Sequence, residues 1–152
     1  MDTESRVKLL KRLGIKDQER ILILSAPKTY LNLLSDFPGQ VDESITGTYE
    51  YIQGFAENLE NALILREQIR SAIVPHGVIW LAYPKGSSKK YKSDINRTKL
   101  WDFFGDFEYE PVSQVAIDED WSSIRFKHVD DIKKMSRKNA ATEKGKARVQ
   151  KK

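Results

Sequence analysis

Cysteine is absent from this chain of 152 residues, and histidine occurs only twice. The absence of cysteine excludes disulfide bonds, thiolate catalysis and every cysteine-based metal centre. The two histidines, His76 and His128, are few and far apart in the sequence, which argues against a histidine-rich metal cluster. The sequence therefore predicts no metal site and no cofactor.

Long hydrophobic runs are also missing, since no stretch reaches the roughly 18 apolar residues that a membrane-spanning helix needs. The chain opens with the acidic segment Met1-Asp2-Thr3-Glu4, which has neither the basic nor the apolar part of a secretory signal. Hydrophobic residues make up 39% and aromatic residues 10%, values that are ordinary for a globular domain. We expect a soluble, cytoplasmic protein with no membrane partner.

Positive charge is scarce outside the C-terminal end. Residues 131–152 contain nine Lys or Arg and two acidic residues, a net charge of +7, whereas residues 1–130 carry −3. This division predicts one α/β domain over residues 1–130 and a basic, flexible tail over residues 131–152. Scattered positive charges of this kind would bind nucleic acid weakly and without sequence preference, or would only keep the chain soluble.

The segment Val78-Ile79-Trp80-Leu81-Ala82-Tyr83 is an apolar run without polar alternation, and Ile21-Leu22-Ile23-Leu24 is a second one. Such strands must be covered on both faces, as in a parallel sheet between two helix layers. Further strands are predicted over residues 41–45 (at an edge), 49–55, 112–117 and 122–129, and helices over residues 4–13, 30–36, 59–73 and 95–104. The order predicts an α/β domain, with a mostly parallel sheet between two helix layers and a C-terminal antiparallel hairpin.

Turn and cap residues set several of these boundaries. Thr3 is predicted to cap the first helix and Gly14 to follow its end. Asn58 is predicted to cap the longest helix, which Pro75-His76-Gly77 would end.

In open sheets of this kind ligands bind just beyond the carboxyl ends of the strands. Two lysines occupy such positions, since Lys28 follows the first apolar run and Lys85 follows the second. If the two strands are neighbours, both lysines would face one crevice that attracts anions, with Tyr83 at its mouth and with Ser87 and Ser88 donating hydrogen bonds to the same ligand. The alternative is a solvated loop whose lysines only maintain solubility.

Other polar residues have a structural and a functional interpretation. Asp118, Asp120 and Trp121 could form a carboxylate pair beside an aromatic platform, but the pattern favours residues that shape a hairpin. For His128 we favour a half-buried structural role, and for His76 a role at the end of a helix.

The segments Pro84-Lys85-Gly86-Ser87-Ser88 and Asp118-Glu119-Asp120-Trp121-Ser122-Ser123-Ile124-Arg125-Phe126 resemble a family of small, mostly bacterial proteins of unknown function. Those proteins look like a trimmed relative of the Rossmann-like methyltransferase fold. The resemblance extends over residues 13–129 and also includes Ala26-Pro27 and Ser93-Asp94-Ile95. It implies a Rossmann-like three-layer α/β sandwich and no established activity.

The chain departs from methyltransferases in the turn after the first apolar run. A nucleotide cofactor needs a glycine-rich turn there, because a side chain would block close approach of the backbone. Here the turn is Ser25-Ala26-Pro27-Lys28, and the eight glycines never occur as G-x-G. Pro27 also lacks an N–H donor. These residues argue against adenosyl-methionine or dinucleotide binding in the usual mode.

Three functions remain open from the sequence. The favoured one is a non-catalytic module that binds a small anionic ligand or a partner in the crevice. The alternatives are a methyltransferase-like enzyme and a nucleic-acid-associated protein that acts through its basic tail. The oligomeric state is left open.

Overall fold

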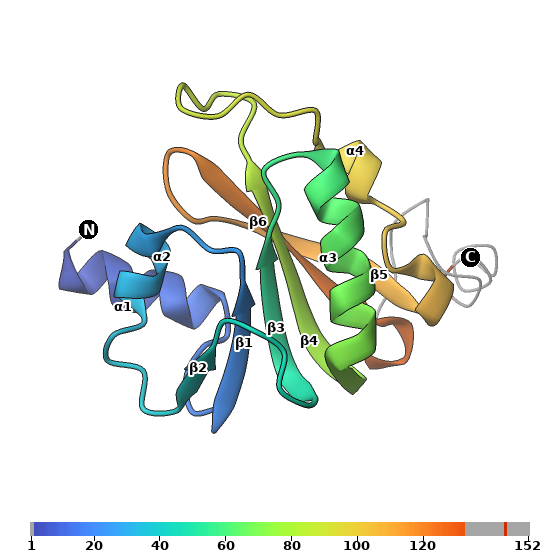
Figure 1. Ribbon diagram of the computed structural model, residues 1–152, viewed down its shortest axis with the longest axis horizontal. Coiled ribbons are helices and arrows are strands. Elements are labelled where there is room, and N and C mark those ends of the chain that lie inside the picture. The colour runs from blue at the N-terminus through green and yellow to red at the C-terminus, as the bar shows by residue number, and fades with distance from the viewer. Residues whose placement is uncertain (1, 133–144, 146–152) are drawn as a thin grey trace.

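The structure is a computed structural model that describes residues 2–132 and residue 145. This part of the chain forms a six-stranded sheet with helices on both faces (Figure 1). The helices are α1 (Thr3–Arg12), α2 (Lys28–Leu33), α3 (Leu59–Ala72) and α4 (Arg97–Leu100), with 3-10 turns η1 (Gly105–Phe107) and η2 (Val129–Asp131). The strands are β1 (Arg20–Leu24), β2 (Gln40–Asp42), β3 (Tyr49–Phe55), β4 (Ile73–Pro84), β5 (Tyr109–Ala116) and β6 (Trp121–His128).

The strand order is β2-β1-β3-β4-β6-β5. Strands β2, β1, β3 and β4 pair in parallel, whereas β6 runs antiparallel to both β4 and β5. The sheet is therefore mostly parallel and ends in an antiparallel hairpin, which confirms the predicted fold class. Both apolar runs lie on interior strands, and the strand predicted at an edge is β2.

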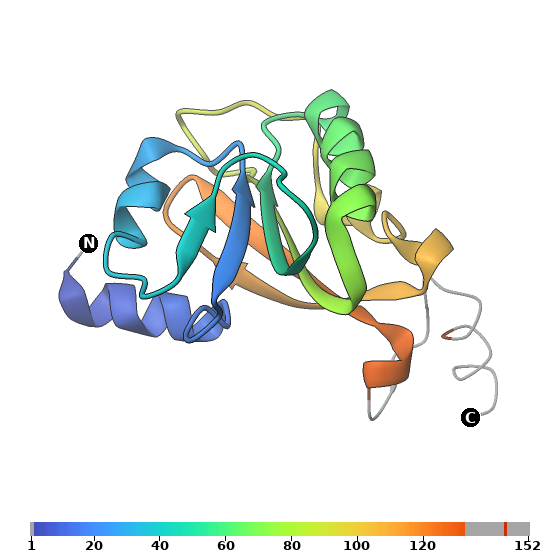
Figure 2. The same ribbon diagram turned by 60° about the horizontal axis from the view of Figure 1, so that its bottom comes forward.

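Two hydrophobic cores, one on each face, explain why the Val78 run has no polar alternation. Helices α3 and α4 cover one face of the sheet, and α1 and α2 cover the other (Figure 2). Along β4, Ile79, Leu81 and Tyr83 belong to the first core, whereas Trp80 and Ala82 belong to the second. Successive side chains of a strand point to opposite faces, so burial on both faces requires apolar residues throughout.

Several boundaries differ from the prediction. The cap of α1 is Asp2, whose carboxylate accepts a hydrogen bond from the Ser5 N–H (2.7 Å), and not Thr3, which is already helical. Helix α2 covers residues 28–33 instead of 30–36, and α4 is a single turn within the predicted helix 95–104. The Pro75-His76-Gly77 segment does not form a separate turn after α3, because β4 begins directly at Ile73.

The hairpin between β5 and β6 is held by its own acidic residue. One carboxylate oxygen of Asp118 accepts hydrogen bonds from the N–H groups of Asp120 and Trp121, both at 2.8 Å. This confirms the hairpin interpretation of these residues. Most of the predicted tail lies outside the described residues. In the part of the chain that the structure describes, none of the helices combines the length and apolar character that crossing a bilayer requires.

Alkaline pH should destabilise the fold through its buried tyrosines. Burial raises the pKa of Tyr109 to about 12, and the negative charge of Asp131 adds to the shift. The pKa of an unfolded tyrosine is about 10. The contribution of Tyr109 to the free energy of unfolding is therefore fully present below that pH, and it is lost as the pH rises toward 12. Melting temperatures across this range measure the fall, which should be shallower in Tyr109→Phe. An unchanged slope in that variant would exclude Tyr109 as a contributor.

Candidate functional site

A cleft opens where the strand order reverses. After β1 the chain crosses to β2 on one side, and it then returns to form β3 on the other side of β1. Parallel sheets bind ligands at this switch point, beyond the carboxyl ends of the two diverging strands. The cleft there has a volume of about 300 Å³ and is lined by Ser25, Ala26, Pro27, Phe55, Glu57, Asn61, Ile64, Leu65, Gln68, Tyr91 and Trp121.

The backbone at the β1 end of the cleft turns sharply. Ser25, the first residue after β1, adopts a left-handed conformation with φ +61°. A residue other than glycine rarely adopts this conformation, which costs about 1–2 kcal/mol. The chain thus makes a tight turn at the strand end although no glycine is present, and the turn leads through Ala26 and Pro27 into α2.

Helix α3 provides the polar side of the cleft. Its first turn is fixed by Asn58, whose side chain accepts a hydrogen bond from the Asn61 N–H (2.9 Å). The Asn61 and Gln68 side chains are exposed and line the cleft, as does Glu57, which follows β3. In the described part of the chain, Glu57 is the one charged side chain of this lining. The cleft therefore favours a neutral or cationic ligand over an anion.

Aromatic rings form another part of the lining, called here the aromatic wall. The Trp121 ring lies edge-on to Phe55 at a centroid distance of 5.2 Å and to Tyr91 at 5.1 Å. Trp121 is held in the core by the hairpin, and Tyr91 belongs to the loop after β4. Aromatic faces of this size suit a planar, partly apolar ligand group.

The loop after β4 is attached to the hairpin. The Ser88 hydroxyl donates to a carboxylate oxygen of Asp120 (2.7 Å) and accepts a hydrogen bond from the Tyr91 N–H (3.1 Å). The Lys85 N–H donates to the Asp120 carbonyl oxygen (2.8 Å). The Ser88 hydroxyl, predicted to donate to an anion, is thus engaged in positioning Tyr91 and the aromatic wall.

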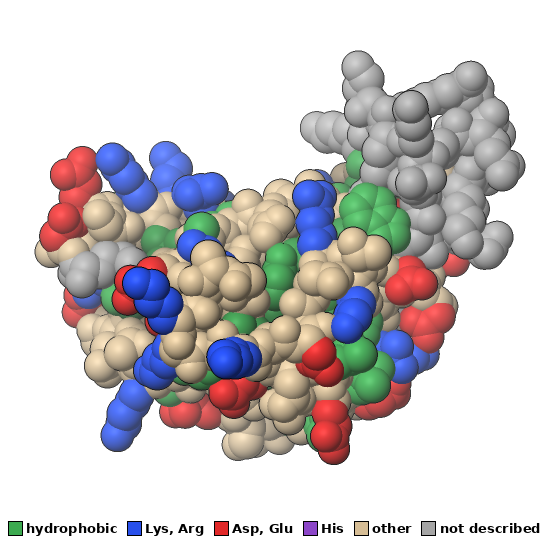
Figure 3. Space-filling view, turned by 90° about the horizontal axis from the view of Figure 1, so that it is seen from above, with side chains coloured by type: hydrophobic (Ala, Val, Ile, Leu, Met, Phe, Trp, Pro, Cys, Tyr) green, Lys and Arg blue, Asp and Glu red, His purple; other side chains and the backbone are tan. Residues whose placement is uncertain are grey.

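The five predicted site residues do not all meet in one place. Strand β3 lies between β1 and β4, so Lys28 and Lys85 follow strands that are not neighbours. Tyr83, Lys85 and Ser87 border a second, more open hollow of about 520 Å³ beside β5, whereas Lys28 begins α2. Figure 3 looks onto this end of the molecule, where lysine and arginine side chains project from several separate points.

Sequence analysis missed Glu57, Asn61, Gln68 and Tyr91. The signal for Glu57 was available, because it follows β3 as Lys28 and Lys85 follow β1 and β4. The other three carry no signal of their own. Their place depends on which strands are neighbours and on how α3 crosses them.

No family model and no curated protein matches the chain. Solved structures do match. A SAM-dependent methyltransferase from Aquifex aeolicus has a TM-score of 0.59 at 13% identity, covering 80% of this chain and 88% of its own. The ribosomal protein L11 methylase from Lactobacillus delbrueckii subsp. bulgaricus has a TM-score of 0.52 at 9% identity, covering 84% of this chain and 80% of its own. The pyocyanin biosynthetic protein PhzM has a TM-score of 0.52 at 8% identity, covering 81% of this chain and 54% of its own.

These neighbours correct the favoured prediction of a non-catalytic module that binds a small anionic ligand or a partner, because they agree better with the methyltransferase-like alternative. The charge of the cleft agrees with the correction, since the predicted lysines do not line it. The resemblance to an uncharacterised bacterial family stays a prediction. At these identities the likeness concerns the fold, and the chain has a Rossmann-like, methyltransferase-like α/β fold.

Proposed function

We propose that this chain is a methyltransferase-like protein that binds S-adenosylmethionine (SAM) in the cleft between the carboxyl ends of β1 and β3. The observation that carries the proposal is the position of the cleft at the switch point, with one acidic group and three aromatic rings in its lining. SAM has no phosphate, so a cleft without lysine or glycine-rich phosphate contacts is compatible with it.

The residues of the cleft fit the parts of this ligand. Ser25 adopts the left-handed conformation that a glycine would otherwise supply at this turn, and the turn borders the cleft directly after β1. The volume of about 300 Å³ is at the lower end of the range for sites that hold small ligands. When bound, SAM supplies a methyl group activated on a sulfonium.

The side chains have separable roles in this proposal. Tyr91 and Trp121 would contact the flat adenine ring. The carboxylate of Glu57 would hold a cationic group of the ligand, and Asn61 and Gln68 would form hydrogen bonds with its hydroxyl or amino groups. The exposure of these three polar side chains permits substitutions there that leave the core intact.

We expect saturable, one-to-one binding of SAM and of its demethylated product in calorimetry with the full chain. Glu57→Gln should weaken SAM binding about tenfold, equal to the loss of one charge-assisted contact of roughly 1.4 kcal/mol. Binding should also change the fluorescence of Trp121, which borders the cleft.

The matched control is Glu60→Gln, which removes the same charge from the first turn of α3 but outside the cleft lining. It should bind SAM like the unaltered chain. Absence of binding by the unaltered protein, or equal loss in both variants, would overturn the proposal.

A further inference from the structure

The two histidines of the chain, 52 positions apart in the sequence, lie against each other in the structure. The rings of His76 and His128 are stacked at a centroid distance of 3.8 Å, with 17° between their planes. His76 comes from the irregular first part of β4 and His128 from the last residue of β6. The two residues are far apart in the sequence and meet because β4 and β6 are paired neighbours.

Two carboxylates from the η2 turn complete the cluster. The Nδ1 atom of His76 lies 2.9 Å from a carboxylate oxygen of Asp131, and Nδ1 of His128 lies 3.7 Å from a carboxylate oxygen of Asp130. One ligand atom each from His76, His128 and Asp130 can be chosen so that all three lie within 4.8 Å of one another. We propose that this cluster is a binding site for a divalent transition metal such as Zn²⁺.

The donor atoms lie within reach of the spacing that this ion requires. Two ligand atoms bound to one tetrahedral Zn²⁺ at roughly 2.0–2.2 Å lie about 3.3 Å apart, so donors that are now up to 4.8 Å apart would have to approach by up to about 1.5 Å. Imidazole nitrogen with carboxylate oxygen is a donor set that Zn²⁺ accepts, whereas Mg²⁺ and Ca²⁺ prefer oxygen alone. Three protein ligands leave a fourth position of the metal for water or another group.

The surroundings orient both rings. The contact between His76 Nδ1 and the Asp131 carboxylate is the outer-shell arrangement that fixes a metal-binding histidine, and it leaves Nε2 of His76 for the ion. The Tyr109 ring stands edge-on against His128 at 5.5 Å, and its hydroxyl donates to the Gly77 carbonyl oxygen (2.8 Å). The buried Tyr109 ring thereby restricts the position of the His128 ring.

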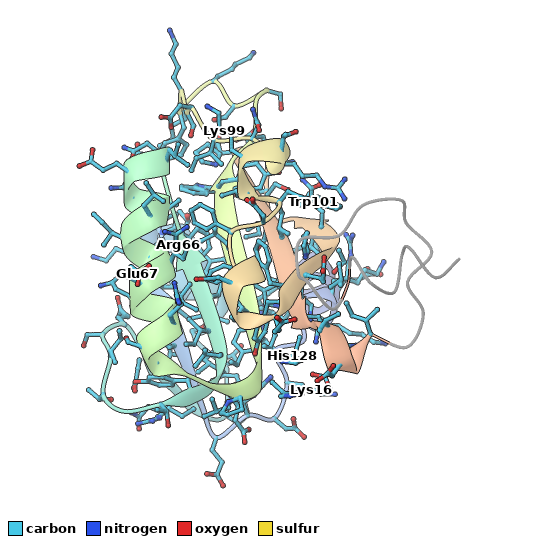
Figure 4. All side chains as sticks on the ribbon, turned by 90° about the vertical axis from the view of Figure 1, so that its right-hand side faces the viewer. Lys16, Arg66, Glu67, Lys99, Trp101 and His128 are labelled. Carbon is cyan, nitrogen blue, oxygen red and sulfur yellow. The ribbon has the colours of Figure 1, made fainter. Side chains whose placement is uncertain are left out.

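The backbone at His76 has an unusual conformation. Its φ is +63°, a left-handed conformation that a residue other than glycine rarely adopts. Nearly parallel rings place their nitrogen atoms side by side, so the ion must rotate one ring out of the stack. The side chains of His76 and its partner Asp131 are 45% and 39% exposed, so they have room to move together, whereas the His128 side chain is 14% exposed and stays in place. Figure 4 shows His128 at the opposite end of the molecule from Lys99.

The test is a calorimetric titration of the full chain, freed of metal, with Zn²⁺ alone. We expect one saturable site, no comparable binding of Mg²⁺, and a shift of both imidazole signals in proton NMR. His76→Asn and His128→Gln should each abolish the site, and Asp131→Asn should weaken it 10- to 100-fold, as outer-shell changes do.

Asparagine tolerates the left-handed conformation, so His76→Asn should keep its melting temperature and lose only the metal. Glu57→Gln, at the far end of the sheet, should bind Zn²⁺ normally, which separates this site from the SAM cleft. Absence of saturable Zn²⁺ binding, or binding that survives in the double variant without histidine, would overturn the proposal.

Discussion

Trp80→Ala should lower the free energy of unfolding by about 3–5 kcal/mol, the range for removing a large aromatic side chain from a core. Trp80 is 1% exposed and belongs to the core between the sheet and helices α1 and α2. For a chain of this length the loss corresponds to a fall in melting temperature of roughly 10 °C or more. Thermal and denaturant unfolding of the full chain measure it.

The control for this prediction is Trp80→Phe. The Trp80 Nε1–H is buried and has no hydrogen-bond partner among the described residues, so the indole N–H contributes no favourable contact there. Phenylalanine keeps most of the apolar ring and removes the unpaired donor, and it should cost less than about 1.5 kcal/mol. Equal losses of unfolding free energy in the two variants would contradict the placement of the Trp80 ring in the core.

Gly39→Ala should destabilise the fold by about 3 kcal/mol, at the upper end for inserting one methyl group into a packed site. A β-carbon on Gly39 would lie 2.2 Å from the Gln18 carbonyl oxygen and 2.6 Å from that of Glu19. Both are backbone atoms at the entry to β1, so the clash cannot be relieved by a side-chain rotation. The adjacent Gln40 N–H, which donates to the Glu19 carbonyl oxygen (2.8 Å), would be displaced with it.

Gly86→Ala is the matched control, because a β-carbon there meets no atom of the described residues within 4 Å. It should change the melting temperature little. A comparable fall in melting temperature in the two variants would mean that the effect comes from the flexibility of glycine in general, and not from contact with the backbone before β1. A stable Gly39→Ala variant would require the β1–β2 connection to run differently.

The elements themselves could be predicted because their signals are local. Asn58 caps α3 through its own side chain, and Asp118 closes the hairpin through amides two and three positions along the chain. The apolar run from Val78 to Tyr83 predicted burial on both faces, since each residue of a strand reports on the face to which it points. The prediction of a helix over residues 95–104 was less accurate, because the end of this helix is not decided by local signals. Helix α4 ends at Leu100, and the residues after it, among them Phe103 and Phe104, pack into the core, which depends on partners far away in the sequence.

The position of the site depended on contacts between distant residues. The rule that ligands bind beyond strand ends directed attention to Lys28 and Lys85, but it does not say which ends are adjacent. Insertion of β3 between β1 and β4 separated the two lysines and brought Glu57 beside the turn at Ser25. Strand order is decided by how whole layers pack, and short-range patterns do not contain it.

The sequence by itself determined the α/β class, the mixed sheet and the segments that form its core, because burial and hydrogen bonding act residue by residue. Only the tertiary structure decided which polar groups meet. In the folded protein Glu57 lines the same cleft as Tyr91 and Trp121 of the aromatic wall. The rings of His76, from β4, and His128, from β6, are stacked. Strand order and pairing set the distances between side chains of separate elements. A chemical site requires such side chains at short distances, so it becomes visible only in the tertiary structure.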